Sequence, residues 1–368
     1  ITQGDTNGIG WEVILKALAD PRMTELFTPV VYGSPKAAAY YRNTIAEIEA
    51  FSFNPVASAA EARRGKTNLV ACGENAEIMP GKPAPEAGRA AVEALCTAMR
   101  DLKAGQLDAL VTAPFDKETV QADDFRYTGH TEYLAAELEG DAMMIMCSDS
   151  LRVGLATKHI PVSEIARNIT KERIVRDLDT LRRALIEDFG IVEPRIAVMA
   201  LNPHAGDGGL LGCEEQEIIR PAIVEAFGKG VLAFGPFAAD GLFAGGGYAK
   251  YDGILAMYHD QGLAPFKTLS PDGVNFTAGL SAVRTSPDHG TAFDIAGKDK
   301  ADPQSMRNAI YTAIDIVEHR RAWTEWTRNP LQHAERDRGG RDVSVKDLPQ
   351  TGSVFRLVIV EAPKAPKT

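Results

Sequence analysis

Short apolar runs alternate with longer amphipathic segments over most of the first 325 residues, and this alternation constrains the fold most strongly. It predicts an α/β fold in which helices cover a mostly parallel sheet. The expected strands are residues 30–32, 68–71, 109–112, 143–147, 153–157, 195–201 and 254–258. The expected helices are residues 11–18, 85–105, 131–138, 171–189, 214–227 and 303–320. In such sheets ligands bind beyond the carboxyl ends of strands, so residues that directly follow a strand are candidate site residues.

Composition excludes several classes of protein. The 368 residues are 45% hydrophobic and 24% charged, which is ordinary for a globular protein, and the net charge of −10 argues against nucleic-acid binding through bulk charge. No apolar run reaches the roughly 18 residues of a membrane span, and no signal peptide is recognisable. The four cysteines form no CxxC pair, so a reducing, cytoplasmic location is expected.

Three of the seven histidines share one context. "VGLATKH" ends at His159, "IAVMALNPH" at His204 and "ILAMYH" at His259, so each histidine closely follows an apolar strand. Parallel strands would bring the three imidazoles to one rim of the sheet. Three protein ligands with one open position are the pattern of a catalytic metal site. The alternative is three unrelated surface or capping histidines.

Two glycine-containing segments are further candidates. "NPHAGDGGLLGCEEQEI", residues 202–218, is a Gly-rich loop that enters a helix, and its alternative is an ordinary flexible connection. "YTGHTEYLA", residues 127–135, places His130 and Thr131 at the start of a helix. Thr131 could cap that helix, and its free amides would attract an anion, although a plain N-cap is the simpler interpretation.

Cationic and polar side chains gather late in the chain. In "MYHDQGLAPFK" Lys267 follows His259 by eight residues, and "GVNFTAGLSAVRTSPDHGTAFDIAG" contains Asn275, Arg284, Asp288 and His289. An arginine fork suits carboxylate or phosphate, so these residues indicate an anion site. The alternative is a loop with a solvated face.

Several motifs together indicate a family. They are "TAPFDK", "GHTEYLA", "LNPHAGDGG", "AMYHDQGL", "VNFTAGL" and "RTSPDHGTAFDIAGK". With these motifs, which occur in the family's order, residues 1–325 resemble the 4-hydroxythreonine-4-phosphate dehydrogenase family, NAD-dependent enzymes of pyridoxal phosphate synthesis. The resemblance implies a two-lobed α/β/α fold like that of isocitrate and isopropylmalate dehydrogenases. Its first lobe would comprise residues 1–118 and about 270–327, and its second lobe residues 119–269 with a central cleft. Residues 328–368 would be a C-terminal extension of unknown role, in which "SVFRLVIV" could add a strand.

The resemblance also implies roles for individual residues. His159, His204 and His259 would bind one divalent metal (Zn, Mg or Co). The family is homodimeric, with metal ligands from both subunits, so the three strand ends need not belong to one chain. The substrate-binding residues would be His130, Thr131, Lys267, Asn275 and Arg284. NAD or NADP would be the cofactor, with candidate contacts at Asp288, His289 and Gly290, and Asp260 could be the general base or support a metal ligand.

The implied reaction is the oxidation of 4-phosphooxy-L-threonine at C3. The product, 2-amino-3-oxo-4-phosphooxybutanoate, would decarboxylate to 3-amino-2-oxopropyl phosphate. The opening "GDTNGIGWE" departs from the family pattern at Thr6, Asn7 and Trp11, and this departure bears on the substrate more than on the chemistry. The alternatives are a dehydrogenase of 4-phosphothreonate or 4-phosphoerythronate, a three-histidine metal hydrolase and a non-enzymatic anion-binding protein.

Overall fold

The structure is a computed structural model, and it describes residues 1–46, 48, 51–73 and 77–331. Residues Ile1–Glu325 form one compact unit, and of the unit that follows only residues 326–331 are described. The expected strand "SVFRLVIV" therefore lies outside the described residues, and the division of the compact unit into two lobes stays a prediction. Among the described residues, no helix is both long and apolar enough to cross a membrane.

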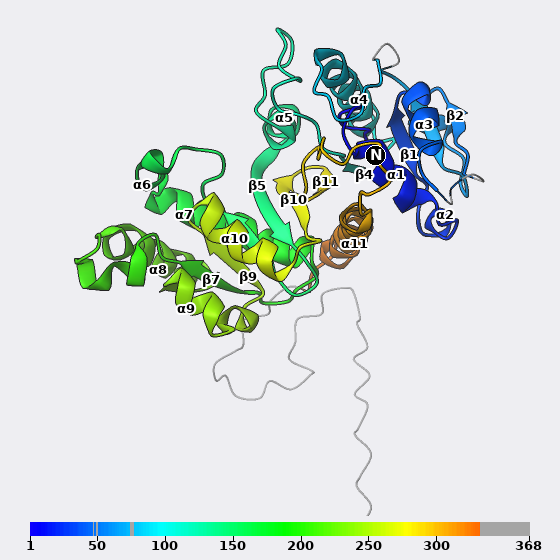
Figure 1. The fold of residues 1–368 in the computed structure, drawn as a ribbon. Coiled ribbons are helices and arrows are strands. Elements are labelled where there is room, and N and C mark those ends of the chain that lie inside the picture. Colours follow the sequence, from blue (N-terminus) through cyan, green and yellow to red (C-terminus); the bar gives the residue numbers. More distant parts are fainter. Residues whose placement is uncertain (47, 49–50, 74–76, 332–368) are drawn as a thin grey trace, which may run out of the picture. The chain divides into compact units, whose positions relative to one another are not determined.

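An eight-stranded mixed sheet runs through the compact unit (Figure 1). The pairs at its two ends are parallel, and the three pairs in between, β11–β10, β10–β5 and β5–β6, are antiparallel. A smaller sheet, in the order β1(Val30–Gly33)–β3(Asn68–Ala71)–β2(Asn54–Val56), is entirely parallel. Across the two sheets most strand pairs are parallel, so the predicted α/β class is confirmed. The large sheet has the order β4(Ala109–Val111), β11(Val283–Pro287), β10(Val274–Leu280), β5(Gly140–Cys147), β6(Arg152–Leu155), β9(Gly253–Ala256), β7(Arg195–Met199) and β8(Leu232–Phe237).

Helices cover both faces of the sheet because residues of a strand point alternately to either side. Ile196 and Val198 of β7 share one buried cluster with Leu181 of α7(Lys171–Glu187), whereas Ala197 shares another with Phe266 of α10(His259–Leu269). The helix α7 begins at the N-cap Thr170 and buries the apolar side of an amphipathic pattern. The other helices are α1(Gly10–Leu18), α2(Met23–Leu26), α3(Pro35–Arg42), α4(Pro85–Lys103), α5(His130–Glu137), α6(Ile165–Asn168), α8(Arg220–Gly228), α9(Ala239–Ala244) and α11(Gln304–Thr327).

The sequence did not predict the hairpin formed by β10 and β11, which lies within the large sheet. Val274, Phe276 and Ala278 alternate as buried strand residues should, and they pack into the core. The intervening positions hold polar residues such as Asn275 and Thr277, which obscured the strand pattern. A polar loop was the alternative that the composition suggested, and it is wrong for residues 274–280.

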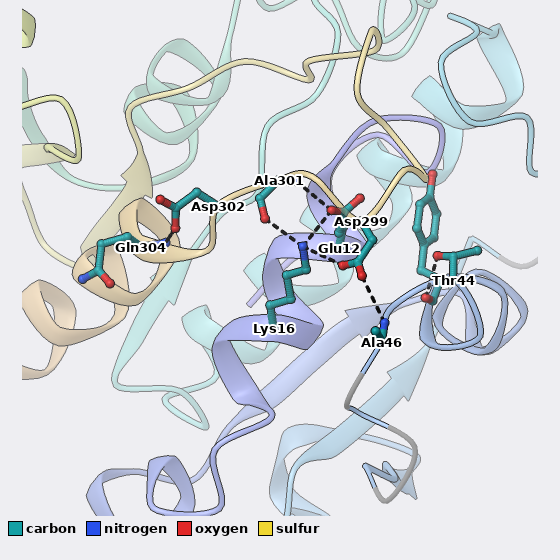
Figure 2. Close-up of polar contacts among 9 residues, drawn as sticks. Glu12, Lys16, Thr44, Ala46, Asp299, Ala301, Asp302 and Gln304 are labelled. Carbon is teal, nitrogen blue, oxygen red and sulfur yellow. Dashed lines mark hydrogen bonds and ion pairs between the residues drawn. The ribbon is translucent and has the colours of Figure 1, made fainter.

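A buried ionic network joins α1 to the segment that precedes α11 (Figure 2). Lys16 Nζ lies 3.0 Å from Glu12 Oε1 and 2.8 Å from Asp299 Oδ1, and it donates to the carbonyl oxygen of Ala301 at 2.9 Å. The Ala301 amide donates to Glu12 Oε1 at 2.7 Å, and the Ala46 amide donates to Asp299 Oδ2 at 3.1 Å. Glu12 is fully buried, so Lys16 supplies the charge that this carboxylate needs.

Replacing Lys16 with methionine is expected to lower the free energy of unfolding by about 2 to 4 kcal/mol, because the buried Glu12 carboxylate loses its cation. Thermal and urea unfolding measure this loss. Lys229→Met is the matched control, since Lys229 and Glu225 form an exposed i,i+4 pair on the surface of the protein. Equal melting temperatures for the two variants would contradict the role given to Lys16.

Candidate active site

A cavity of about 290 Å³ is lined by all five predicted substrate-binding residues, two of the three predicted metal ligands and all three cofactor candidates. Its walls come from α5, α10, the β10–β11 hairpin and the segments that follow β4 and β6. The residues that the sequence predicted here are His130, Thr131, His159, His259, Lys267, Asn275, Arg284, Asp288, His289 and Gly290. The cavity is also lined by Lys117, which follows a predicted strand, and by four residues with no predicted role: Thr112, Phe115, Glu132 and Ser286.

Arg284, on β11, the second strand from one edge of the large sheet, places a positive charge in the wall of the cavity. Its side chain is 3% exposed and donates to the hydroxyl oxygens of Thr112 and Thr277. Burial lowers the pKa of Arg284 to about 9, although the charge of Glu132 works in the opposite direction. Within the part of the chain that the structure describes, no carboxylate forms an ion pair with Arg284. A buried guanidinium without a counter-charge is costly, so this position favours an anionic ligand.

Lys267 adds a second cation to the same cavity. It lies on α10, two helical turns after His259, and its Nζ is 2.9 Å from Asp288 Oδ1. Burial raises the pKa of Asp288, while the hydrogen bond from Lys267 opposes this rise. Lys267 therefore has a partner that an incoming phosphate or carboxylate could replace.

His130 begins α5 and stacks on Phe115, with ring centroids 3.8 Å apart and an interplanar angle of 21°. Burial, together with the charges of Arg284 and Lys117, holds the pKa of His130 well below its usual range. The imidazole is therefore neutral at neutral pH and can donate or accept a hydrogen bond.

The helix that begins at His130 differs from the predicted one in its cap. Gly129 is the N-cap and Thr131 lies in the first turn, so the suggestion that Thr131 caps the helix is wrong. Thr131 is buried and lines the cavity, and its contact with substrate stays a prediction.

His159 and His259 lie side by side, with ring centroids 5.5 Å apart. Each ring has a carboxylate near Nδ1, because Glu132 Oε1 is 3.9 Å from His159 and Asp260 Oδ1 is 2.7 Å from His259. The interaction with His159 lowers the pKa of Glu132 to about 2, against the effect of burial. A carboxylate at Nδ1 directs the lone pair of a histidine to Nε2, and this arrangement fits two ligands of a divalent metal.

His204 lies apart from these two histidines. The strands β6, β9 and β7 are parallel neighbours, as the sequence analysis expected. However, the turn after β7 takes His204 to a separate cavity of about 450 Å³, whose walls include Tyr258 and Gln261. Among the described residues, no three His, Cys, Asp or Glu side chains are arranged to hold a metal. The expectation that one chain brings all three imidazoles to one rim is therefore wrong.

Three further side chains bear on the predicted roles. Asn275 Oδ1 and His289 Nε2 are buried without a hydrogen-bond partner among the described residues, and both side chains line the cavity. Unpaired buried polar atoms are uncommon and indicate that a ligand completes their bonding. The side chain of Asp260 is 85% exposed and is absent from the cavity wall, where its neighbour His259 lies.

The comparisons with known proteins agree on one family. A family model described as "Pyridoxal phosphate biosynthetic protein PdxA" matches residues 25–313. A protein of Bacteroides thetaiotaomicron named 4-hydroxythreonine-4-phosphate dehydrogenase is 53% identical over 336 residues, which are 90% of this chain and 92% of the relative.

Solved structures give the same result. The structure of 4-hydroxythreonine-4-phosphate dehydrogenase from Klebsiella pneumoniae is 35% identical with a TM-score of 0.74, and the match covers 86% of this chain and 96% of that one. A terephthalate 1,2-cis-dihydrodiol dehydrogenase from Burkholderia xenovorans LB400 is 28% identical with a TM-score of 0.57, covering 85% of this chain and 96% of that one. The extent of these matches shows that the chain belongs to the PdxA family of pyridoxal phosphate biosynthetic proteins.

Proposed function

We propose that this protein is a metal-dependent 4-hydroxythreonine-4-phosphate dehydrogenase of pyridoxal phosphate biosynthesis. It would oxidise 4-phosphooxy-L-threonine at C3 to 2-amino-3-oxo-4-phosphooxybutanoate, which decarboxylates to 3-amino-2-oxopropyl phosphate. The observation that carries this proposal is the buried Arg284, which forms no ion pair among the described residues, in one cavity with Lys267 and two neighbouring imidazoles. The names of the relatives support the same reaction.

The substrate's two anionic groups, phosphate and carboxylate, match two of the cations that line the cavity, Arg284 and Lys267. Arg284 offers a planar fork and Lys267 a mobile point charge, and both would form charge-assisted hydrogen bonds with oxygen atoms. His130, Thr131 and Asn275 would orient the substrate through neutral hydrogen bonds. The unpaired Asn275 Oδ1 suits a donor such as the substrate's ammonium or hydroxyl group.

His159 and His259 would hold a divalent metal together with His204 from a second copy of the chain. Zinc, magnesium or cobalt bound there would lower the pKa of the substrate's C3 hydroxyl and so favour loss of its proton as hydride leaves. Asp260 was a candidate general base, but its contact with His259 Nδ1 supports a role in orienting that ring.

A dehydrogenase needs a hydride acceptor, and the family implies a nicotinamide cofactor, for which we propose NAD, with NADP as the alternative. Asp288, His289 and Gly290 form one side of the cavity, and the unpaired His289 Nε2 is free to contact this cofactor. Burial lowers the pKa of His289, so a neutral imidazole would make the contact.

A homodimer would bring His204 to the metal. Leu210 and Leu211, which follow the His204 turn, are 79% and 44% exposed, and apolar side chains of this kind are typical of a protein interface. The lobes predicted from the resemblance, residues 1–118 with about 270–327 and residues 119–269, would close around the site. The four cysteines form no disulfide, which supports the proposed cytoplasmic location.

NADH formation by purified, metal-loaded protein tests the proposal. We expect chelator-sensitive turnover of 4-phosphooxy-L-threonine. Turnover of only 4-phosphothreonate or 4-phosphoerythronate would retain the mechanism and change the substrate. A metal-bound protein that produces no NADH from any of the three acids would contradict the proposal and favour a hydrolase or a binding protein.

A further inference from the structure

The turn that carries His204 has an unusual backbone. Six consecutive residues have positive φ angles, namely 54° at His204, 54° at Ala205, 79° at Gly206, 43° at Asp207, 67° at Gly208 and 104° at Gly209. Three of them are not glycine, and the left-handed conformation costs such residues about 1 to 2 kcal/mol each. The turn therefore needs support from its surroundings to persist.

The support comes from a carboxylate that lies later in the sequence. Glu215 is 1% exposed, and its Oε1 accepts hydrogen bonds from the backbone amides of Leu201 at 2.8 Å and Asn202 at 2.7 Å. Its Oε2 accepts a third hydrogen bond, from Asn202 Nδ2 at 3.0 Å. Glu215 thus fixes the two residues that lead into the turn, using both oxygens of one buried group.

The turn itself packs on the same carboxylate. A Cβ on Gly206 would lie only 2.6 Å from Glu215 Oε2, so the glycine permits a close approach that a larger residue would prevent. Glu214 Oε2 also accepts a hydrogen bond from Asn202 Nδ2, at 2.7 Å. Glu215 begins a π-helical turn, Glu215–Ile219, ahead of α8, and such turns are frequent at functional sites.

We propose that Glu215 is a positioning residue that holds the left-handed turn in shape and so presents His204, already oriented, to a metal centre in a second copy of the chain. The proposal rests on the proposed function in assigning His204 to the metal. A turn relaxed by loss of Glu215 would have to be ordered again upon each binding event. This ordering would weaken metal affinity and would leave the rest of the site unchanged.

Glu215→Gln tests the proposal, since it retains the shape of the side chain and removes its charge. We expect the dissociation constant for Zn²⁺, measured by calorimetry on the full chain, to rise about 10- to 100-fold, as for other groups that support metal ligands. The matched control is Glu217→Gln, an exposed glutamate two residues away, which should leave the constant unchanged.

A double-mutant cycle separates positioning from general damage to the fold. In a His204→Ala background, Glu215→Gln should weaken Zn²⁺ binding no further, because the residue that it positions is already gone. If the two effects add, or if Glu215→Gln binds Zn²⁺ as tightly as the unmodified protein, the inference is overturned. If His204→Ala alone leaves Zn²⁺ binding intact, the assignment of His204 fails instead.

A second variant covers the case in which Glu215→Gln does not fold. Gly206→Ala disturbs the same contact from the turn, through both the close approach to Glu215 Oε2 and the φ of 79°. It should also weaken Zn²⁺ binding about 10-fold or more. Unchanged Zn²⁺ affinity in a folded Gly206→Ala protein would contradict the need for this turn geometry.

Discussion

His159→Ala is expected to lower metal-dependent turnover by about 10³-fold or more, since a metal supplies several kcal/mol of transition-state stabilisation. The ring centroids of His159 and His259 are 5.5 Å apart, so His159→Ala removes one of the two predicted metal ligands in the cavity. The measurements are kcat/KM at saturating metal and the affinity for Zn²⁺, and both should decrease.

His319→Ala is a suitable control for this prediction. His319 lies on α11, donates a hydrogen bond from its Nδ1 to the carbonyl oxygen of Asp188 and does not line the cavity. Its replacement should leave Zn²⁺ affinity unchanged. A His159→Ala protein with full turnover and full metal content would show that the metal binds elsewhere.

Arg284→Met is expected to raise KM for the phosphorylated substrate by about 10²-fold, because truncating a buried charged partner typically costs 2 to 5 kcal/mol. In contrast, the unliganded protein should keep or gain stability. The pKa of Arg284 is lowered from 12.5 to about 9, so the folded state disfavours its charge. This cost is present at every pH below about 9 and is relieved as the pH rises from 9 towards 12.5. Methionine removes the cost at neutral pH.

Thermal unfolding with and without inorganic phosphate, alongside steady-state kinetics, checks both parts of this prediction. Phosphate should raise the melting temperature of the unmodified protein and have little effect on Arg284→Met. Arg183→Met, which removes an exposed arginine paired with Asp179, should retain the effect of phosphate. A strongly destabilised Arg284→Met protein that still responds to phosphate would mean that Arg284 has a structural role and that the anion binds elsewhere.

Sequence patterns predicted the part of the fold whose side chains follow regular alternation. The strands before His159 and His259 are buried on both faces and read as plain apolar runs, and the structure confirms them as parallel neighbours. The hairpin β10–β11 was missed because it is both core and binding surface. Asn275 and Arg284 contribute to the cavity wall from strands whose other residues pack in the interior.

The position of His204 could not be predicted from the strand pattern. Six consecutive residues with positive φ turn the chain after β7, and only three of them are glycine. Their conformation depends on Glu215, a residue that follows the turn and forms its hydrogen bonds with residues before it. Likewise, Glu132 gave no signal of its own in the sequence. Its contact with His159 depends on how α5 packs beside the end of β6.

Subunit complementation tests most directly the central claim that two copies of the chain build each metal site. His159→Ala and His204→Ala proteins, each inactive alone, are mixed, dissociated and allowed to reassociate. If His204 is the third ligand of a metal that is bound by the partner's His159 and the partner's His259, each mixed dimer contains one intact site. The sample should then recover about one quarter of the unmodified activity. If all three histidines serve one chain, every site carries one substitution and no activity returns, which would contradict the account.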